Sequence, residues 1–382
     1  MKILITTDLF TTSTNGVVTS VRNLHDELKE KGHDVRILTL SGDRESYKEG
    51  PVYYIKSIPI GFVYPDVRMP ISYWNRLIKE LIDWKPDVVH SQCEFFSFQF
   101  AKRIAKLTGA PIVHTYHTLY EQYVTYLTPS KFIGKQFVRQ LSRMRLKKVK
   151  MVIAPTSKVE AALRGYGIKT DIQVVPTGIS LEQHHYRVSA EERQKKRQEL
   201  GIPEQNHVLL NLGRLGTEKN LEELLEFFAV AVKEEPDLTF MIVGDGPDKS
   251  HLEQMAKKLG IAEHMVFTGM VNPLEVQKYY QLADVFVSAS TSETQGLTYI
   301  EAAANGLPLL CREDPCLKDV IKEGVNGYEY STEAEFLEKL RLIMENPEWR
   351  KKAGAQSEKI AESFDKEHFV ESIEDIYEEI TV

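Results

Sequence analysis

Short apolar or β-branched segments alternate with longer amphipathic segments along most of the chain. The short segments have the length and composition of buried strands, and the longer ones show the period of helices. This alternation predicts βαβ units that build a parallel sheet. In the first half of the chain the expected strands are 2–6, 35–40, 87–90, 111–115, 151–154 and 172–175.

The same alternation restarts after a charged segment, 180–203, that holds few strand-forming residues. The strands expected there are 207–212, 239–243, 265–267, 285–287 and 308–311. We therefore predict an α/β protein with two doubly wound, Rossmann-like parallel-sheet domains, at 1–180 and 181–364. Ligands of such sheets bind beyond the carboxyl ends of the strands, so we expect the domains to face an interdomain cleft.

The composition is that of an ordinary folded enzyme. Of 382 residues, 42% are hydrophobic and 27% are charged, which argues against a disordered chain. No apolar run approaches the roughly 18 residues of a transmembrane helix, and the N-terminus suits a buried strand better than a signal peptide, so we expect a cytoplasmic protein. Cys93, Cys311 and Cys316 have no metal-type spacing and are expected in the core, without a disulfide or a zinc site.

One segment departs from the average charge. The chain has a net charge of −7, yet residues 122–159 contain no acidic residue and residues 131–150 contain eight Lys or Arg. On a helical wheel the apolar residues of this segment share one face, and basic residues recur every four positions on the opposite face. The apolar face comprises Ile133, Phe137, Val138, Leu141 and Met144.

This pattern predicts a basic amphipathic helix that binds an anionic membrane surface reversibly. The membrane-binding candidates are Lys131, Lys135, Arg139, Arg143, Arg145, Lys147 and Lys148. An ordinary surface helix with solvated charges is the alternative interpretation. Nucleic acid is the rival anionic partner, but the acidic remainder of the chain and the missing RNA-binding motifs argue against it.

A second segment, 58–74, mixes aromatic and apolar residues with three prolines, at Pro59, Pro65 and Pro70. It is too broken for a simple helix. An exposed segment of this kind would form an apolar lip suited to a lipid tail, and a buried one would be a packed loop.

Two candidate cations follow the first strand of the second domain. They are Arg214 and Lys219 in the segment Gly213–Lys219 (GRLGTEK). Fixed cations at this position would stabilise the charge that develops on a leaving diphosphate in a sugar-nucleotide reaction. As isolated residues they would more often be solvated surface charges.

Two glutamates, Glu293 and Glu301, flank a loop in which Gly296 precedes a helix that starts near Leu297. The backbone amides of Gly296 and Leu297 can face a phosphate at such a helix end. Glu301 can accept hydrogen bonds from vicinal hydroxyls such as those of a ribose, and Glu293 can reach a transferred sugar.

Three residues of the first domain are further candidates. Asn15 and Gly16 permit a tight turn after the first strand, where a diphosphate can approach backbone amides. His117 falls where a strand opens into the expected crevice, although a histidine is often a structural residue.

Together these segments resemble glycosyltransferase family 4, the retaining enzymes of the GT-B fold, over nearly the whole chain. The matching motifs are the E-x7-E pair Glu293 and Glu301, Arg214 with Lys219, Gly244–Pro247 (GDGP) and Val175–Gly178 (VPTG). Asn15 stands where many members carry a second glycine. The resemblance also implies that a last helix, at 365–382, returns to the first domain.

The resemblance implies a role for each candidate. Arg214 and Lys219 would bind the donor diphosphate beside Gly213 and Gly244, and Glu301 would bind the ribose. Glu293 and His117 would contact the sugar hydroxyls, with Gly16 against the phosphate or sugar. It further implies front-face attack with retention, the leaving phosphate taking the acceptor proton, and no metal or other cofactor.

Within this family, residues 114–126 (HTYHTLYEQYVTY) and 292–302 (SETQGLTYIEA) are similar to bacterial diacylglycerol glucosyltransferases. This similarity implies glucose transfer from UDP-glucose to 1,2-diacylglycerol by an enzyme bound peripherally to the inner face of the cell membrane. The alternatives are another lipid acceptor, such as phosphatidylinositol or a glycolipid, a non-hydrolysing UDP-sugar epimerase, and a non-catalytic lipid-binding scaffold.

Overall fold

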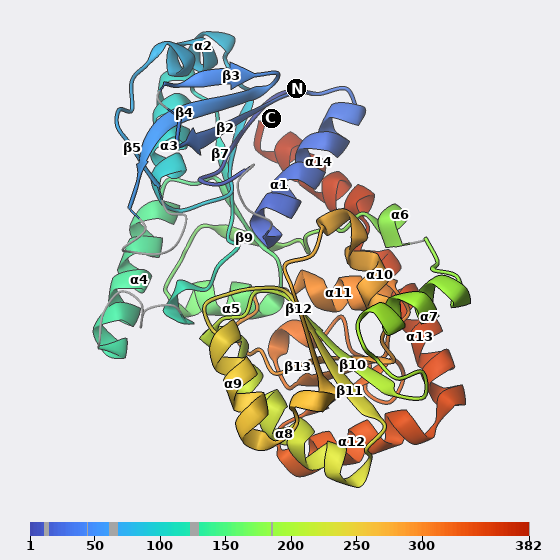
Figure 1. Cartoon of the computed structure of the whole chain (residues 1–382). Helices are drawn as coiled ribbons and strands as arrows, with labels where there is room; N and C mark the ends of the chain where they lie inside the picture. Colours follow the sequence, from blue (N-terminus) through green and yellow to red (C-terminus); the bar gives the residue numbers. More distant parts are fainter. Residues whose placement is uncertain (11–14, 44, 61–67, 123–129, 185, 382) are drawn as a thin grey trace. The chain divides into compact units, whose positions relative to one another are not determined.

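The computed structural model describes residues 1–10, 15–43, 45–60, 68–122, 130–184 and 186–381. The chain divides into two compact units, Met1–Ile179 with Lys366–Val382, and Ser180–Asp365. These limits lie within one residue of the predicted ones. Each unit is built on its own sheet, with helices packed on both faces (Figure 1).

The first unit contains a nine-stranded sheet in the order β3-β4-β2-β1-β6-β7-β8-β9, with β5 paired to β4. Strands β4, β2, β1, β6, β7, β8 and β9 run parallel to their neighbours in this order, whereas β3 and β5 are antiparallel to β4. The prediction of a wholly parallel sheet is therefore wrong at this edge. Only two residues join β3 to β4, which is too few for a parallel crossover.

The strands of the first unit have these bounds: β1 Lys2–Thr6, β2 Asp34–Ser41, β3 Tyr47–Glu49, β4 Val52–Pro59, β5 Arg68–Pro70, β6 Val88–Ser91, β7 Ile112–Thr115, β8 Met151–Ala154 and β9 Asp171–Val174. Its helices are α1 Gly16–Glu30, α2 Arg76–Trp84, α3 Phe96–Thr108, η1 Tyr120–Gln122, α4 Lys131–Leu146, α5 Ser157–Gly165 and α14 Lys366–Thr381.

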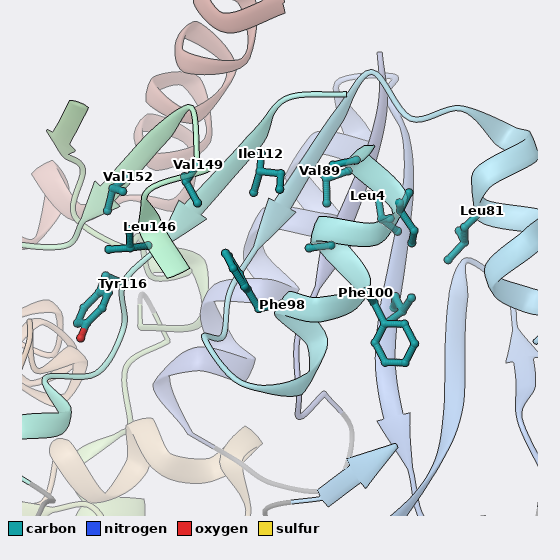
Figure 2. Packing of buried hydrophobic residues seen from close by; sticks show 14 of the residues in the cluster. Leu4, Leu81, Val89, Phe98, Phe100, Ile112, Tyr116, Leu146, Val149 and Val152 are labelled. Atoms are coloured by element: carbon teal, nitrogen blue, oxygen red, sulfur yellow. The ribbon is translucent and has the colours of Figure 1, made fainter. Parts of the chain in front are cut away.

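Two buried clusters cover the two faces of this sheet, because successive strand residues point to opposite sides. Leu4 and Val89 belong to one cluster, with Phe98 of α3, whereas Ile3 and Ile5 belong to the other. Figure 2 shows the first cluster, in which residues of the strands and of α2, α3 and α4 meet.

The C-terminal helix α14 packs on the second face beside α1, far from it in sequence (Figure 1). Its Tyr377 hydroxyl lies 2.6 Å from Nδ1 of the buried His90, whose Nε2 lies 2.8 Å from Thr115 Oγ1. An ion pair between Lys366 and Glu27 joins the start of α14 to α1. The last helix therefore belongs to the first unit, as the resemblance implied.

The second unit contains a six-stranded, wholly parallel sheet in the order β12-β11-β10-β13-β14-β15. Its strands are β10 His207–Leu212, β11 Leu238–Val243, β12 Met265–Gly269, β13 Val285–Ser288, β14 Leu309–Arg312 and β15 Gly327–Tyr330. Its α-helices are α6 Leu181–His184, α7 Ala190–Glu199, α8 Leu221–Glu234, α9 Lys249–Leu259, α10 Val276–Tyr280, α11 Leu297–Ala304, α12 Glu333–Glu345 and α13 Pro347–Ala361. Its 3₁₀ turns are η3 Thr217–Lys219, η4 Ala262–His264, η5 Pro273–Glu275, η6 Pro315–Leu317 and η7 Glu362–Phe364.

Both sheets are doubly wound, as predicted. The strand order reverses between β1 and β6 in the first unit and between β10 and β13 in the second. A ligand binds an open α/β sheet at such a reversal, beyond the carboxyl ends of the strands. A ligand-binding site is therefore expected at the loops that follow β1, β6, β10 and β13.

Among the described residues, no helix combines the length and the apolar composition needed to cross a membrane.

The hydrogen bond between the Tyr377 hydroxyl of α14 and His90 of the sheet predicts the effect of Tyr377→Phe. Burial keeps the pKa of His90 well below its usual value, so the ring is neutral at pH 7. Removing the hydroxyl leaves a buried ring nitrogen without its partner, at a cost of about 1–3 kcal/mol. We expect hydrogen–deuterium exchange in α14 to accelerate about tenfold or more at pH 7.

The exposed neighbour Glu378 supplies the matched control, Glu378→Gln. Equal exchange in α14 for the two variants would contradict the role assigned to the Tyr377 hydroxyl.

Candidate active site

The loops after β10 and β11 pack backbone against backbone. Gly213 and Gly244 have φ angles of 149° and 136°, and a Cβ on Gly244 would lie 1.9 Å from the Gly213 carbonyl oxygen. The amide of Leu215 donates to Asp245 O at 2.9 Å, and the amide of Asp248 donates to Leu215 O at 3.1 Å. Only glycine permits this approach, which fixes the course of the 213–216 loop.

The two predicted cations lie in this loop and in the 3₁₀ turn that follows it. Arg214 has a side chain that is 36% exposed and lies 3.8 Å from the carboxylate of the buried Glu218. Lys219 ends the 3₁₀ turn η3, and its ammonium forms an ion pair with Glu293. Both cations therefore extend from the carboxyl end of β10.

The loop between β13 and α11 supplies the second part of the site. Gly296 lies in the left-handed region with φ 75°, and a Cβ there would lie 2.4 Å from the Tyr299 ring. Helix α11 starts at Leu297, and its N-cap residue, Gly296, has no side chain with which to cap the first turn. The helix dipole favours an anion at this end of the helix.

Hydrogen bonds join these two loops. Ser292 Oγ donates to the carbonyl of Glu218 at 3.0 Å, next to the Lys219–Glu293 ion pair. The structure therefore brings Arg214, Lys219 and Glu293 together at the reversal point of the second sheet. Two cations and a carboxylate at this place can bind a diphosphate and an adjoining hydroxylated group.

Glu301 lies one turn inside α11 and is largely buried. The Tyr280 hydroxyl donates to its Oε2 at 2.7 Å. Burial raises the pKa of Glu301 to about 7, although the Tyr280 hydrogen bond opposes this shift. A carboxyl group with this pKa exchanges its proton near neutral pH and can accept hydrogen bonds once it is ionised.

In the first unit, Asn15 and Gly16 begin α1. The Asn15 side chain accepts from the amide of Val18 at 3.0 Å, so this residue is the N-cap of the helix. Gly16 is exposed at the first helical position. The preceding residues of the predicted turn, 11–14, lie outside the described part of the chain.

His117 follows β7 and lies 2.6 Å from Gln92 Oε1 through its Nε2. Because an amide oxygen only accepts, Nε2 carries the hydrogen. Burial lowers the pKa of His117 to about 3, so the ring is neutral at physiological pH. A neutral imidazole is a group that can hydrogen-bond to a sugar hydroxyl.

The buried Glu94 is next to this site and was not predicted. Its carboxylate accepts from the Tyr120 hydroxyl at 2.7 Å and lies 3.3 Å from His114 Nε2. Gln92 and Glu94 lie just after β6. Because ligands bind beyond the carboxyl ends of such strands, the expected strand at 87–90 could have predicted these two residues as site candidates. No sequence motif pointed to Tyr280 as the hydrogen-bond donor to Glu301, because Tyr280 lies on a different element, α10.

The prediction that the apolar residues of α4 share a single face is wrong, because some of them are buried and others are exposed. The helix packs through a row of residues four apart, Gly134, Val138, Ser142 and Leu146, with the Ser142 hydroxyl 3.0 Å from Tyr116 OH. Ile133, Phe137 and Met144 lie beside this row and are 58–63% exposed. The small residues of the row allow close packing, which leaves the larger apolar side chains in solvent.

The basic residues of α4 divide into two groups. Arg139 forms an ion pair with Glu121 at 2.7 Å, Arg143 donates to Tyr166 O, and Arg145 is half-buried over the Phe98 ring. Glu121 directly precedes the acid-free segment 122–159, so the acidic partner of Arg139 lies outside that segment. Lys135, Lys147 and Lys148 are exposed. The side chain of Lys131 does not belong to the part of the chain that the structure describes.

The segment 58–74 is described only at its ends, because residues 61–67 lie outside the described part. Ile58, Met69, Ile71 and Trp74 are 38–57% exposed. These apolar side chains of the described ends therefore face solvent, whereas Tyr73 packs on Phe100, with the ring centroids 4.7 Å apart.

The three cysteines carry free thiols. Cys311 and Cys316 are buried as predicted, but Cys93 is half-exposed. The described part of the chain holds no group of three or more His, Cys, Asp or Glu side chains arranged to bind a metal ion.

Two family models match the chain, Glycosyltransferase Family 4 at residues 14–183 and Glycosyl transferases group 1 at residues 192–360. The chain is 36% identical over 332 residues to an alpha-monoglucosyldiacylglycerol synthase of Streptococcus pneumoniae, covering 86% of this chain and 75% of that protein. It is 30% identical over 387 residues to an alpha-monoglucosyldiacylglycerol synthase of Acholeplasma laidlawii, covering 99% and 96%.

Solved structures share the fold at low sequence identity. HepE from Anabaena, in complex with UDP and glucose, has a TM-score of 0.79 at 17% identity and covers 99% of this chain and 100% of its own. Sucrose-phosphate synthase from Thermosynechococcus elongatus has a TM-score of 0.78 at 20% identity, covering 99% and 98%. The predicted GT-B fold is confirmed.

The raised pKa of Glu301 predicts a pH-dependent stability. The pKa rises from the ordinary value of 4.5 to about 7 in the folded state. Between these values the folded protein binds more protons than the unfolded chain, so stability falls as pH rises through this window. We expect Glu301→Gln, which removes the buried charge, to raise the urea unfolding midpoint at pH 8 and not at pH 5.

A gain of equal size at both pH values would contradict this account of Glu301. The matched control is Glu263→Gln, at an exposed glutamate of the same unit, which should leave the difference in midpoint between pH 5 and pH 8 unchanged.

Proposed function

Because the chain belongs to glycosyltransferase family 4 and is a hexosyltransferase, we propose that it transfers glucose from UDP-glucose to 1,2-diacylglycerol at a membrane surface, with retention of configuration. The observation that carries the proposal is the contact of Lys219 with Glu293 beside Arg214, in a chain similar to two alpha-monoglucosyldiacylglycerol synthases.

The donor diphosphate would bind to Arg214, Lys219 and the first amides of α11. Negative charge grows on the leaving diphosphate as the glycosidic bond breaks, so these fixed donors stabilise the transition state more than the ground state. The same two cations supply the positive charge that a metal ion supplies elsewhere, and we propose transfer without a metal or another cofactor.

The Lys219–Glu293 ion pair suggests how donor binding proceeds. A diphosphate carries more charge than a carboxylate and would compete with Glu293 for the Lys219 ammonium. Release of the Glu293 carboxylate then leaves it available to accept hydrogen bonds from the sugar hydroxyls. Glu301 would bind the ribose diol in its ionised form, and His117, as a neutral ring, would contact a hydroxyl of the sugar.

Retention follows in this proposal from attack of the acceptor on the face that the diphosphate leaves. The leaving phosphate oxygen takes the proton of the acceptor hydroxyl as the new glycosidic bond forms. No carboxylate nucleophile takes part, so Glu293 acts by orienting the sugar and not by forming a covalent bond.

The surface of the first unit supports a lipid acceptor. Ile133, Phe137 and Met144 lie exposed on α4, next to the exposed Lys147 and Lys148. Apolar side chains with flanking lysines are suited to insertion into an anionic leaflet. Diacylglycerol remains in the bilayer, so an enzyme that uses it must bind the bilayer surface.

Lys219→Ala tests the donor half of the proposal. Loss of one cation at the leaving group is expected to lower transfer of labelled glucose from UDP-glucose to diacylglycerol vesicles by about 100-fold or more. Lys257→Ala, an exposed lysine of α9, is the matched control and should retain activity.

The same assay separates the alternatives. Vesicles without diacylglycerol should give no lipid product, whereas transfer to phosphatidylinositol or a glycolipid in its place, or conversion of UDP-glucose to another UDP-sugar without any lipid, would overturn the proposed acceptor.

Ile133→Ser combined with Phe137→Ser tests the membrane surface. Losing two inserted apolar side chains should weaken sedimentation with anionic vesicles by about tenfold or more, since each contributes roughly 1.5–3 kcal/mol when buried. The affinity for UDP should not change.

Met270→Ser combined with Leu274→Ser is the control, because these residues are 73% and 74% exposed in the second unit. Equal loss of vesicle binding in both double variants would show that α4 is not the membrane-binding surface.

A further inference from the structure

Tyr280 is a buried residue whose side chain reaches the carboxylate of Glu301. It is the last residue of α10, and its ring centroid lies 6.2 Å from that of Phe286. Its hydroxyl donates to Glu301 Oε2 at 2.7 Å and lies 3.4 Å from Thr298 O. Burial raises the pKa of Tyr280 well above its usual value, so the hydroxyl keeps its proton. Tyr280 is therefore a permanent hydrogen-bond donor at this carboxylate.

The charge of Glu301 depends on this one donor. In the described part of the chain no Lys, Arg or His forms an ion pair with Glu301, and Tyr280 is the only hydrogen-bond donor to its carboxylate. Burial and the Tyr280 hydrogen bond shift the pKa of Glu301 in opposite directions, and burial has the larger effect. Loss of the Tyr280 hydroxyl would therefore raise this pKa further and favour the protonated form.

Further hydrogen bonds fix the hydroxyl relative to the carboxylate. Gln281, which follows Tyr280, donates from Nε2 to Asn305 Oδ1 at 3.1 Å and to Tyr186 O at 2.7 Å. Asn305 in turn donates from Nδ2 to the backbone carbonyl of Glu301 at 2.9 Å. The end of α10 is thus tied to the end of α11, and the contact between Tyr280 and Glu301 is held in place from both helices.

The two oxygens of the Glu301 carboxylate differ in their surroundings. Oε2 accepts from Tyr280, whereas Oε1 accepts no hydrogen bond from the residues that the structure describes. Oε1 therefore keeps its two lone pairs for a ligand with hydroxyl donors. A hydrogen bond to an ionised carboxylate is roughly twice as strong as one between neutral groups, so the ionised form is the better acceptor.

We propose that Tyr280 is a positioning residue for nucleotide recognition: by holding Oε2 of Glu301, it presents Oε1 to the ribose diol and makes the site select a ribonucleotide over a 2′-deoxyribonucleotide. The Tyr280 hydroxyl acts through Glu301 and does not touch the nucleotide. A site built to accept from a hydroxyl discriminates against an analogue that lacks it, because the buried acceptor is then left unpaired. This inference rests on the assignment of Glu301 to the ribose in the proposed function.

Isothermal titration calorimetry of the full chain with UDP and with 2′-deoxy-UDP tests this role at pH 7. The ratio of the two affinities isolates the 2′-hydroxyl, because both nucleotides carry the same base and diphosphate. We expect the wild type to prefer UDP about tenfold or more, and Tyr280→Phe to lose most of this preference. In the Glu301→Gln background, Tyr280→Phe should change the ratio no further, since the hydroxyl acts through that carboxylate.

Tyr330→Phe is the matched control. Tyr330 is also fully buried in the second unit, and its hydroxyl lies 3.3 Å from both Glu223 Oε1 and Ser288 O. This substitution removes a comparable buried hydroxyl without changing the surroundings of Glu301, so the preference for UDP should stay at the wild-type level. Saturable binding of 2′-deoxy-UDP shows that each variant is folded.

The pH dependence of the same ratio gives a test that the wild type alone can fail. Its preference for UDP should rise as the pH increases through about 7, because Glu301 ionises there. In Tyr280→Phe this rise should move to higher pH, since the hydrogen bond that lowers the pKa of Glu301 is lost.

The role of Tyr280 would be overturned by a wild-type preference that does not change with pH, by equal preferences of the wild type and Tyr280→Phe, or by equal losses in Tyr280→Phe and Tyr330→Phe. Each of these results is compatible with glucose transfer to diacylglycerol and leaves that part of the proposed function intact. Failure of the wild type to bind UDP would overturn both.

Discussion

The close approach of Gly213 to Gly244 is the constraint on which the site of the second unit depends. A side chain on Gly244 would overlap the Gly213 carbonyl, so glycine is required for the two strand-end loops to pack together. Their hydrogen bonds fix Leu215, and the fixed loop in turn determines where Arg214 and Lys219 extend. The position of the cations is thus set by backbone packing and not by side-chain contacts alone.

Around this loop the second unit gathers several charged groups. Lys219 neutralises Glu293, whereas Glu301 has one hydroxyl donor and a pKa raised by burial. Groups of this kind favour a ligand that brings both anionic oxygens and hydroxyl donors. A nucleotide sugar has both.

Much of the fold could be predicted because buried parallel strands are short apolar runs. The strands at 2–6, 151–154 and 207–212 have the predicted bounds. The prediction missed β15, whose short sequence GYEY contains a glycine and a glutamate, and also β4, although β4 starts with the apolar run VYYI. In the site, Lys219 and Glu293 followed from motifs. The contact of Tyr280 with Glu301 and the packing face of α4 could not be predicted, because both depend on neighbours distant in sequence.

The most direct measurement is the affinity of the intact chain for UDP compared with UMP, by isothermal titration calorimetry. If Arg214 and Lys219 hold the second phosphate, UDP should bind at least about tenfold more tightly than UMP, and Lys219→Ala should remove most of this difference. Equal affinities of the wild type for UDP and UMP would contradict the assignment of the cationic pair to the diphosphate.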